Sequence, residues 1–259
     1  KRINGTSEFV KNIWKLLNNA VFGKTMENLR NRRHISLVTN AREAIKIHSK
    51  PTYTSSTWFS ETLLGIETQQ YTVILNKPIY VGFCILELSK LLMYKTFYDT
   101  LQPIYPDIEL LYMDTDSFFL NIKTEDLYSD IKNIPELKEL FNESIIGRFK
   151  DEAKGKVIDE AVFLRAKTYS WLKVGEIEST HKSKGITKAV ADKLLKHQNY
   201  KNVIKTRNDH YVDNVMLRPV LHDMKLMTQH KKALSAYDDK RFIMDNGIKT
   251  EPYGFKLKV

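Results

Sequence analysis

The amino-acid sequence predicts a mixed α+β protein in which helices and antiparallel strands alternate along the chain. Residues 7–30 carry apolar side chains at helical spacing, and residues 79–98 are apolar almost throughout. Residues 108–122 place two β-prone runs on either side of a short acidic turn, a pattern typical of a hairpin. With 259 residues and no internal repeat, the chain is long enough to bury a core.

The first helix is expected to begin at Ser7, because serine caps helix N-termini, and to end near residue 30. Lys11, Lys15 and Asn19 then fall one turn apart on a single stripe of this helix. A short strand over residues 35–38 and a helix from residue 41 are expected next.

A second hairpin is expected from strands Trp58–Leu64 and Gln70–Leu75, joined through residues 65–67, after a Ser/Thr-rich stretch over residues 52–57. Pro78 then opens a long helix whose apolar character predicts a buried element. Cys84 lies in this run and is expected in the core. As the single cysteine it forms no intrachain disulfide, which favours a reducing, intracellular setting.

Beyond the hairpin at 108–122, a helical segment from residue 125 is expected to break at Pro135. Strands are expected over residues 156–164 and 168–174. The basic remainder predicts a helix near residues 187–196 and strands near 211–217 and 223–234.

The acidic turn carries Asp114 and Asp116, whose side chains would share one face of a strand and converge at a hairpin tip. Two crowded carboxylates repel each other unless a cation lies between them, and oxygen ligands suit Mg²⁺ or Mn²⁺. The alternative is a solvated turn, since Asp and Ser are turn formers. An EF-hand is disfavoured because Phe118 and Phe119 follow where that loop requires Gly.

The charge balance favours a polyanionic partner. Lys and Arg number 41 against 31 Asp and Glu, a formal net charge of +10. Nucleic acid is the expected partner class, and an ordinary basic protein is the alternative. No segment suggests a membrane span.

Three ordered motifs sharpen this expectation. The string Tyr112-Met-Asp114-Thr-Asp116-Ser117 resembles motif C of family B DNA polymerases, and Lys15-Leu-Leu-Asn-Asn19-Ala-Val-Phe22-Gly23 resembles motif B. Lys167-Thr-Tyr169, followed by Lys184-Gly185, resembles the K-x-Y motif and the basic segment that leads into the thumb. The order along the chain is also the family's. The resemblance implies a partial polymerase right hand, with a fingers helix, an antiparallel-sheet palm and a thumb.

The resemblance also implies a role for each matching residue. Asp116 would be the metal-binding aspartate of a two-Mg²⁺ site, with Asp114 as its less directly coordinating neighbour. Lys15 would face the phosphates of the incoming dNTP, and Asn19 would support the same pocket. The remaining positions would contact the nascent base pair (Phe22, Gly23) or DNA (Tyr112, Thr115, Ser117, Lys167, Tyr169, Lys184).

Two substitutions depart from the family pattern. Ala20 stands where motif B has Ser, and Phe22 stands where it has Tyr. A hydroxyl near the nascent pair is therefore missing, which puts fidelity in doubt.

The block from Asn18 to Asn28 resembles the protein-primed branch, which includes polymerases of self-synthesising DNA transposons and related viruses. The implied organisation is a fingers segment (1–34), an insertion that could form the branch's β-hairpin subdomain (35–78), a palm (79–175) and a thumb-like basic region (176–259). The implied partners are primer-template DNA, dNTP and a terminal protein. A family B polymerase primed by oligonucleotides is the close alternative.

Motif A, D-x-x-S-L-Y-P, does not precede Lys15, and this motif supplies the second metal-binding Asp in the family. Because the chain begins with Lys instead of Met, we expect it to be part of a longer polypeptide that carries this carboxylate upstream. The 259 residues alone are then expected to be inactive. The alternative from another class is a non-catalytic DNA-binding remnant, and a metal-dependent nuclease has little support.

Overall fold

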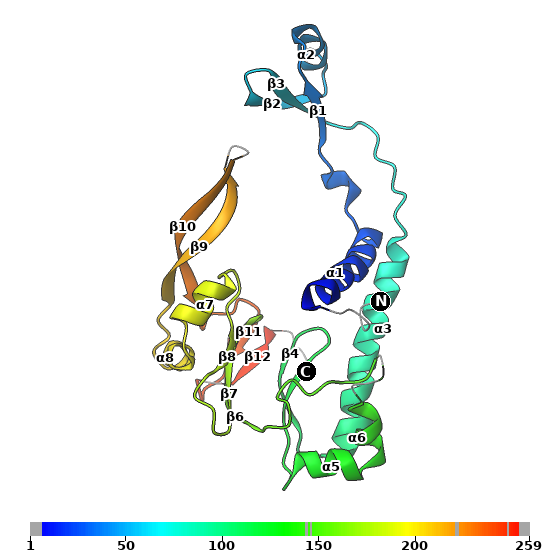
Figure 1. Ribbon diagram of the computed structural model, residues 1–259. Coiled ribbons are helices and arrows are strands. Elements are labelled where there is room, and N and C mark those ends of the chain that lie inside the picture. Colours follow the sequence, from blue (N-terminus) through cyan, green and yellow to red (C-terminus); the bar gives the residue numbers. More distant parts are fainter. Residues whose placement is uncertain (1–6, 143–144, 146, 221–222, 248, 254–259) are drawn as a thin grey trace. The chain divides into compact units, whose positions relative to one another are not determined.

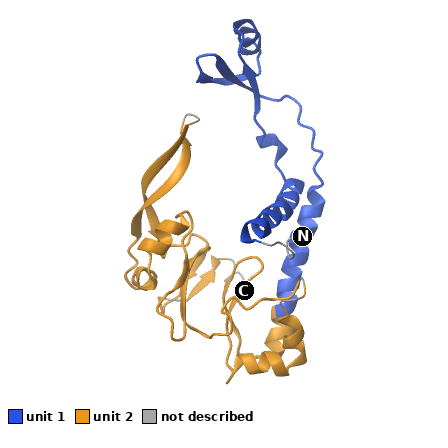
Figure 2. Cartoon of the chain, in the orientation of Figure 1, with its two compact units in different colours: residues 1–96 blue, residues 97–259 orange. Residues whose placement is uncertain are grey.

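The computed structural model describes residues 7–142, 145, 147–220, 223–247 and 249–253. The chain divides into two compact units, residues 1–96 and 97–259, coloured separately in Figure 2. The division lies inside the segment 79–175 that the resemblance assigns to the palm. Helices mix with several antiparallel sheets, so the predicted α+β class is confirmed.

The first unit opens with helix α1 (Glu8–Thr25), labelled in Figure 1. Its N-terminus is capped as expected, because the Ser7 hydroxyl accepts a hydrogen bond from the Val10 amide at 3.3 Å. The helix ends five residues before the predicted limit. There the Thr25 hydroxyl bonds the Phe22 carbonyl at 2.7 Å, and Asn28 caps a separate 3₁₀ turn, η1 (Leu29–Asn31).

A small three-stranded sheet with strand order β1-β3-β2 follows, formed by β1 (His34–Val38), β2 (Tyr53–Ser60) and β3 (Leu63–Thr68). Helix α2 (Ala41–His48) connects the first two strands and is capped by the Asn40 side chain.

The predicted hairpin of strands 58–64 and 70–75 is wrong. The Ser/Thr-rich stretch lies almost wholly in β2, the turn lies at residues 61–62, and residues 70–75 form no strand. Gly65 lies within β3 instead of a turn, and a Cβ there would collide with the ring of Phe59. Glycine therefore lets the Phe59 ring pack closely against the strand at this position and marks no bend.

Helix α3 (Ile79–Tyr94) continues into the π-helix η2 (Lys95–Leu101), in agreement with the predicted helix over 79–98. Its predicted burial is wrong: Phe83 and Leu88 are 61% and 64% exposed, and Cys84 is exposed as well. Gly82 is one of its few buried residues, because the side chains of Thr25 and Met26 at the end of α1 lie against it. The sequence shows that the helix is apolar but not whether other residues of the chain cover it.

The second unit continues with α4 (Gln102–Ile104), the hairpin β4–β5 (Glu109–Met113 and Phe118–Asn121), α5 (Leu127–Asn133) and α6 (Pro135–Leu140). The predicted acidic hairpin is confirmed. The predicted break is also confirmed, because Pro135 is the first residue of α6, a position at which the backbone N–H has no partner within the helix. The apolar sides of these elements enclose one core cluster (Leu101, Tyr105, Ile108, Leu137, Leu140).

The rest of the unit is built on the antiparallel sheet β6-β7-β8 (Ile158–Arg165, Thr168–Lys173 and Thr180–Lys182). Helices α7 (Lys188–Leu194) and α8 (His197–Thr206) follow, then the long ribbon β9–β10 (His210–Val220 and Asp223–Leu234) and the short pair β11–β12 (Arg241–Ile243 and Thr250–Pro252). The sequence predicted all of these except α8, β8 and β11–β12.

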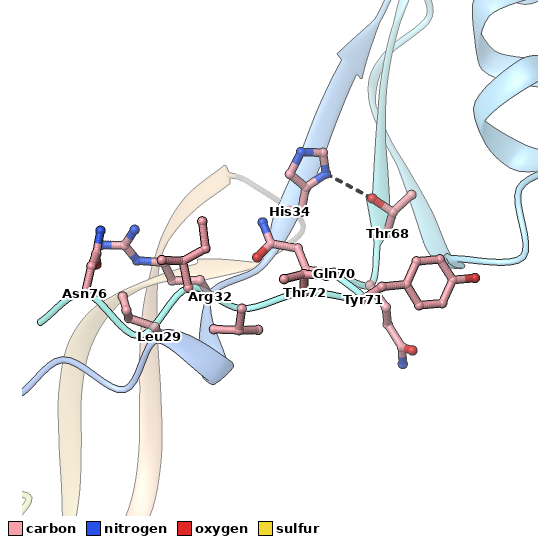
Figure 3. Close-up of a pocket in the computed structure, with 11 residues that line it drawn as sticks. Leu29, Arg32, His34, Thr68, Gln70, Tyr71, Thr72 and Asn76 are labelled. Atoms are coloured by element: carbon pink, nitrogen blue, oxygen red, sulfur yellow. Dashed lines mark hydrogen bonds between the residues drawn. The ribbon is translucent and has the colours of Figure 1, made fainter.

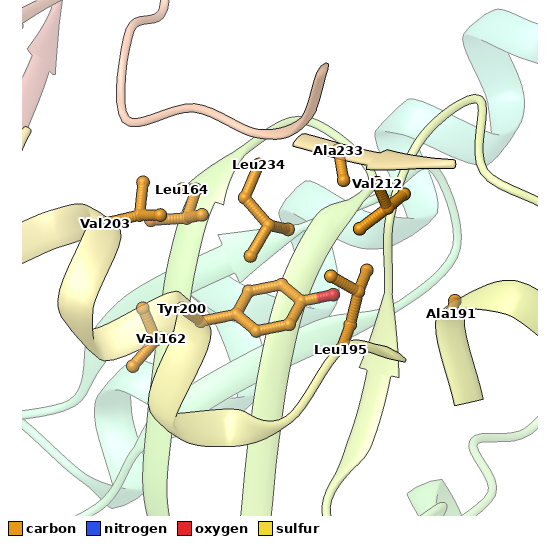
Figure 4. Close-up of a cluster of buried hydrophobic side chains, with 9 residues drawn as sticks. All are labelled: Val162, Leu164, Ala191, Leu195, Tyr200, Val203, Val212, Ala233 and Leu234. Atoms are coloured by element: carbon orange, nitrogen blue, oxygen red, sulfur yellow. The ribbon is translucent and has the colours of Figure 1, made fainter. Parts of the chain in front are cut away.

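Tyr200 lies at the centre of a second core cluster, shown in Figure 4. Its ring is fully buried, and its hydroxyl donates to the carbonyl of Lys182 at 3.0 Å. Apolar side chains from β6, α7, the residue after α7, α8 and both ribbon strands surround it, so this cluster anchors the base of the ribbon to the sheet (Val162, Leu164, Ala191, Leu195, Val203, Val212, Ala233, Leu234). Among the described residues, no helix combines the length and hydropathy that crossing a bilayer would require.

Candidate active site

The candidate site is the four-residue turn 114–117 that joins β4 to β5. Met113 and Phe118 are the last paired residues of the hairpin, and the Asp114 amide bonds the Ser117 carbonyl at 3.2 Å across the turn. Thr115 has φ of 60°, a left-handed conformation that is unfavourable for a β-branched residue. Such strain persists only where the surroundings hold it, and it is concentrated at functional sites.

Most polar groups of the turn bond to Asp114. The Thr115 hydroxyl lies 3.4 Å from Asp114 Oδ1, and the Ser117 hydroxyl donates to the Asp114 carbonyl at 3.3 Å. Asp116 is exposed, and its carboxylate has no partner within the described part of the chain. The two carboxylates thus differ in environment although they are two residues apart.

Lys167 supplies the counter-charge to Asp114. Its Nζ lies 2.8 and 2.7 Å from the two carboxylate oxygens, although 53 residues separate the pair in sequence. This hydrogen bonding raises the pKa of Lys167 above its usual value. Lys167 lies in the turn between β6 and β7 and, like Thr115, has a left-handed φ of 60°. Two strained turns from two different sheets therefore meet at one ion pair.

A cluster of aromatic rings holds the two hairpins together. Tyr112 on β4 stacks on Phe163 of β6, with centroids 5.1 Å apart and planes 6° from parallel. The ring centroid of Phe119 on β5 lies 5.5 Å from that of Tyr169 and 6.2 Å from that of Trp171, both on β7. Aromatic pairs of this kind contribute about 0.5–1.5 kcal/mol each beyond the area they bury.

The structure thus brings several of the predicted site residues together. Tyr112, Asp114 and Lys167 are in direct contact, whereas Tyr169, predicted to touch DNA, has its ring buried against Tyr112 and Phe119. Lys184 is exposed next to this group, and its amide bonds the Thr168 hydroxyl at 3.3 Å.

Lys15, Asn19, Phe22 and Gly23 lie on α1, in the other unit. The structure therefore describes them separately from the turn. Lys15 and Asn19 are exposed and one helical turn apart, as predicted. No residue of α1 is buried.

One cation near the turn is not predicted from the sequence. Lys182 Nζ lies 5.6 Å from the centroid of the Tyr169 ring. Lys182 and Lys184 are exposed on either side of the buried Ser183. In a strand, residues two apart share a face, so this spacing indicates that both lysines lie on the same side.

As a magnesium site the turn is incomplete. Asp116 fits as one oxygen ligand, because its carboxylate is exposed and no other described residue bonds to it. Asp114 is already engaged by Lys167. Across the described ranges, no group of three or more His, Cys, Asp or Glu side chains could hold a metal ion. Further carboxylates would have to come from outside these residues.

A separate open groove of about 510 Å³ lies in the first unit, between η1 and the extended segment 69–76 (Figure 3). Three of its polar side chains are engaged, because His34 bonds Thr68 at 2.9 Å and Arg32 forms a two-bond pair with Glu27. None of the predicted site residues lines it.

Comparison with known proteins identifies no relative: no protein-family model, curated protein or solved structure matches the chain.

Proposed function

We propose that this chain carries fingers, palm and thumb segments of a family B DNA polymerase, which adds deoxynucleotides to a primer 3′-hydroxyl. In this proposal α1 is the fingers helix, the turn 114–117 is the palm motif, and the basic region after residue 176 is the thumb.

The contact between Lys167 and Asp114 is the observation that supports this proposal most. Motif C and the K-x-Y motif are separate strings, with 53 residues between Asp114 and Lys167, and a polymerase needs both at the primer end. In the second unit the two strings are joined by hydrogen bonds of 2.7–2.8 Å. If the two short motifs matched by chance, their residues would not be expected to lie in contact.

Each residue then has a physical task. Asp116 offers a carboxylate to Mg²⁺, and a pair of such ions would activate the primer hydroxyl and neutralise the triphosphate. Lys15, exposed on its helix, supplies a positive charge to the leaving pyrophosphate. Lys167 and Lys184 contact DNA phosphates and fix the primer in register.

We propose that priming starts from the hydroxyl of a terminal protein. The resemblance of residues 18–28 to the protein-primed branch supports this. The insertion 35–78 also has its own sheet, β1-β3-β2, as expected for an added subdomain at this position. An oligonucleotide-primed enzyme would extend a short primer equally well without that protein.

One observation favours the alternative of a DNA-binding remnant without chemistry. The charge of Asp114 is neutralised by Lys167. No group of three or more His, Cys, Asp or Glu among the described residues could hold a metal ion together with Asp116. These 259 residues alone are therefore expected to bind DNA without extending it. The longest reading frame that contains them is the protein to test.

The test is Mg²⁺-dependent primer extension by that full-length protein and its Asp116→Asn variant. Loss of one metal ligand is expected to lower extension at least about a hundredfold, with DNA binding kept. Asp107→Asn, which neutralises an exposed aspartate elsewhere in the same unit, is the matched control. Equal extension by the Asp116→Asn protein would remove the metal role. A wild-type protein that binds DNA but never extends a primer would establish the remnant instead.

A further inference from the structure

A single hydrogen bond connects Tyr112 to the backbone of Lys167. The Lys167 amide donates to the Tyr112 hydroxyl at 2.8 Å, across 55 residues of sequence. Lys167 lies in the turn between β6 and β7, outside the paired residues of the hairpin. The bond therefore provides an acceptor for a turn amide that no strand neighbour satisfies.

The ring of Tyr112 is held in place on several sides. It stacks on Phe163, and its centroid lies 5.3 Å from that of Tyr169 and 6.0 Å from that of Phe119. A ring fixed in this way presents its hydroxyl at a defined point with little loss of side-chain freedom on bonding.

This defined point matters because Lys167 adopts a left-handed backbone conformation. A non-glycine residue with φ of 60° is strained, and a relaxed turn would carry the lysine side chain in another direction. From the observed backbone position the ammonium reaches both oxygens of Asp114. The side chain itself is 59% exposed, so burial does not hold it there.

We propose that Tyr112 is a positioning residue, whose hydroxyl holds the Lys167 turn so that the lysine ammonium meets Asp114. This inference deepens the proposed function, on which it rests for the role of Lys167 at the primer end. It reassigns the Tyr112 hydroxyl, expected from the resemblance to contact DNA, to an internal hydrogen bond. Phenylalanine would keep the ring contacts and lose only this bond.

The test measures the Lys167 ammonium directly, without polymerase activity. The full-length protein is acetylated with an amine-reactive reagent, and the modification rate of each lysine is followed by peptide mass spectrometry. Ion pairing is expected to slow the acetylation of Lys167 relative to that of Lys184, which is exposed and has no side-chain partner among the described residues. In Tyr112→Phe the Lys167 rate is expected to rise about three- to tenfold, the usual net effect of one hydrogen bond.

Three further proteins make the outcome decisive. Asp114→Asn should raise the Lys167 rate in the same way, and the double variant should add nothing. Tyr211→Phe removes a hydroxyl from another stacked tyrosine, whose ring centroid lies 5.4 Å from that of His230. This variant should leave the Lys167 modification rate unchanged. An unchanged rate in Tyr112→Phe overturns the proposal, and so does a parallel rise at Lys184, which would report general loosening.

Primer extension by the same variants separates the two proposals. If Tyr112→Phe frees Lys167 but the wild-type protein extends no primer, the positioning role stands and the polymerase function fails. If Tyr112→Phe loses extension with Lys167 still protected, Tyr112 acts on DNA directly and the positioning role is wrong.

Discussion

The ammonium of Lys167 lies within 2.8 Å of both carboxylate oxygens of Asp114, so the acidic turn carries its own counter-charge. This pair joins two strained turns, and it leaves Asp116 as the free carboxylate of the motif. Because the pair is exposed, breaking it is expected to change the free energy of unfolding little and to affect activity more.

Asp114→Asn and Lys167→Gln are each expected to lower primer extension by the full-length protein, because each breaks the same ion pair. The double variant should be no worse than the more damaging single variant, since the two side chains act as a unit. Melting temperatures should stay close to that of the wild type. The exposed pair Lys123 and Asp107 provides the control cycle, in which neither variant changes extension. Independent, additive losses at Asp114 and Lys167 would contradict the coupling.

Gly23→Ala is expected to separate stability from activity. Gly23 lies in α1 without a positive φ, and a Cβ there would meet no atom within 4 Å in the described chain. Alanine should therefore stabilise the helix by about 0.5–1 kcal/mol. If Gly23 faces the nascent base pair, the added methyl group should lower extension. Asn12→Ala, another exposed site on α1, should raise helix stability alone. Thermal unfolding and primer extension test the pair, and full activity in Gly23→Ala would exclude this glycine from the site.

Arg218 and Lys225 are expected to contribute to DNA affinity, because these two cations lie directly opposite each other on the β9–β10 ribbon. Both are exposed, and neither has a side-chain partner among the residues described. Like charges in register destabilise a strand pair, and a bound phosphate would offset this. Changing both to Gln should reduce the slope of log affinity against log salt by about two. Lys132→Gln on α5 is the control, and an unchanged slope in the ribbon variant would show that DNA lies elsewhere.

His197 is expected to make the second unit less stable as the solution is acidified. Its buried ring contacts Ser170 through Nδ1 at 2.9 Å, and Glu160 of β6 and Lys201 of α8 are its charged neighbours. Burial lowers the pKa of His197 below its usual value, against the opposing influence of Glu160. The unfolded chain therefore binds the proton first as pH falls below about 6.5, and stability drops from there toward the folded-state pKa.

Denaturant unfolding measured between pH 5 and 8 tests this sign, and the loss cannot exceed about 1.4 kcal/mol per pH unit for one proton. His197→Asn, which keeps a polar atom near Nδ1, should flatten the dependence. Gln198→Asn changes an exposed, non-titrating neighbour on α8 and should leave it unchanged. A stability that rises on acidification would refute the assignment.

Local patterns in the sequence predicted most elements of the fold. Ser7 and Asn40 mark helix starts because their side chains bond the first free amides, and these signals lie within a few residues. The insertion was harder. Thr57 and its neighbours in β2 are largely polar and exposed, so no alternation distinguished this strand from a loop. Burial of α3 could not be predicted either, because it depends on what covers the helix.

The candidate site was predicted as a set of positions and not as a geometry. Asp114 and Asp116 were found because their turn is local. The Tyr112 to Lys167 hydrogen bond joins two hairpins, and a left-handed lysine has no signature in a single sequence. The sequence therefore suggests candidate site residues, and the structure of the second unit shows which of them are in contact.

The exposed position of Cys84 has a practical consequence for measuring the distance between the two units. It is the chain's single cysteine, so one maleimide fluorophore would mark α3 alone. A second cysteine introduced on α5 would accept the acceptor dye, and energy transfer between the two would report the separation of the units in solution. The same labelled molecule could be followed while primer, nucleotide and magnesium are added in turn.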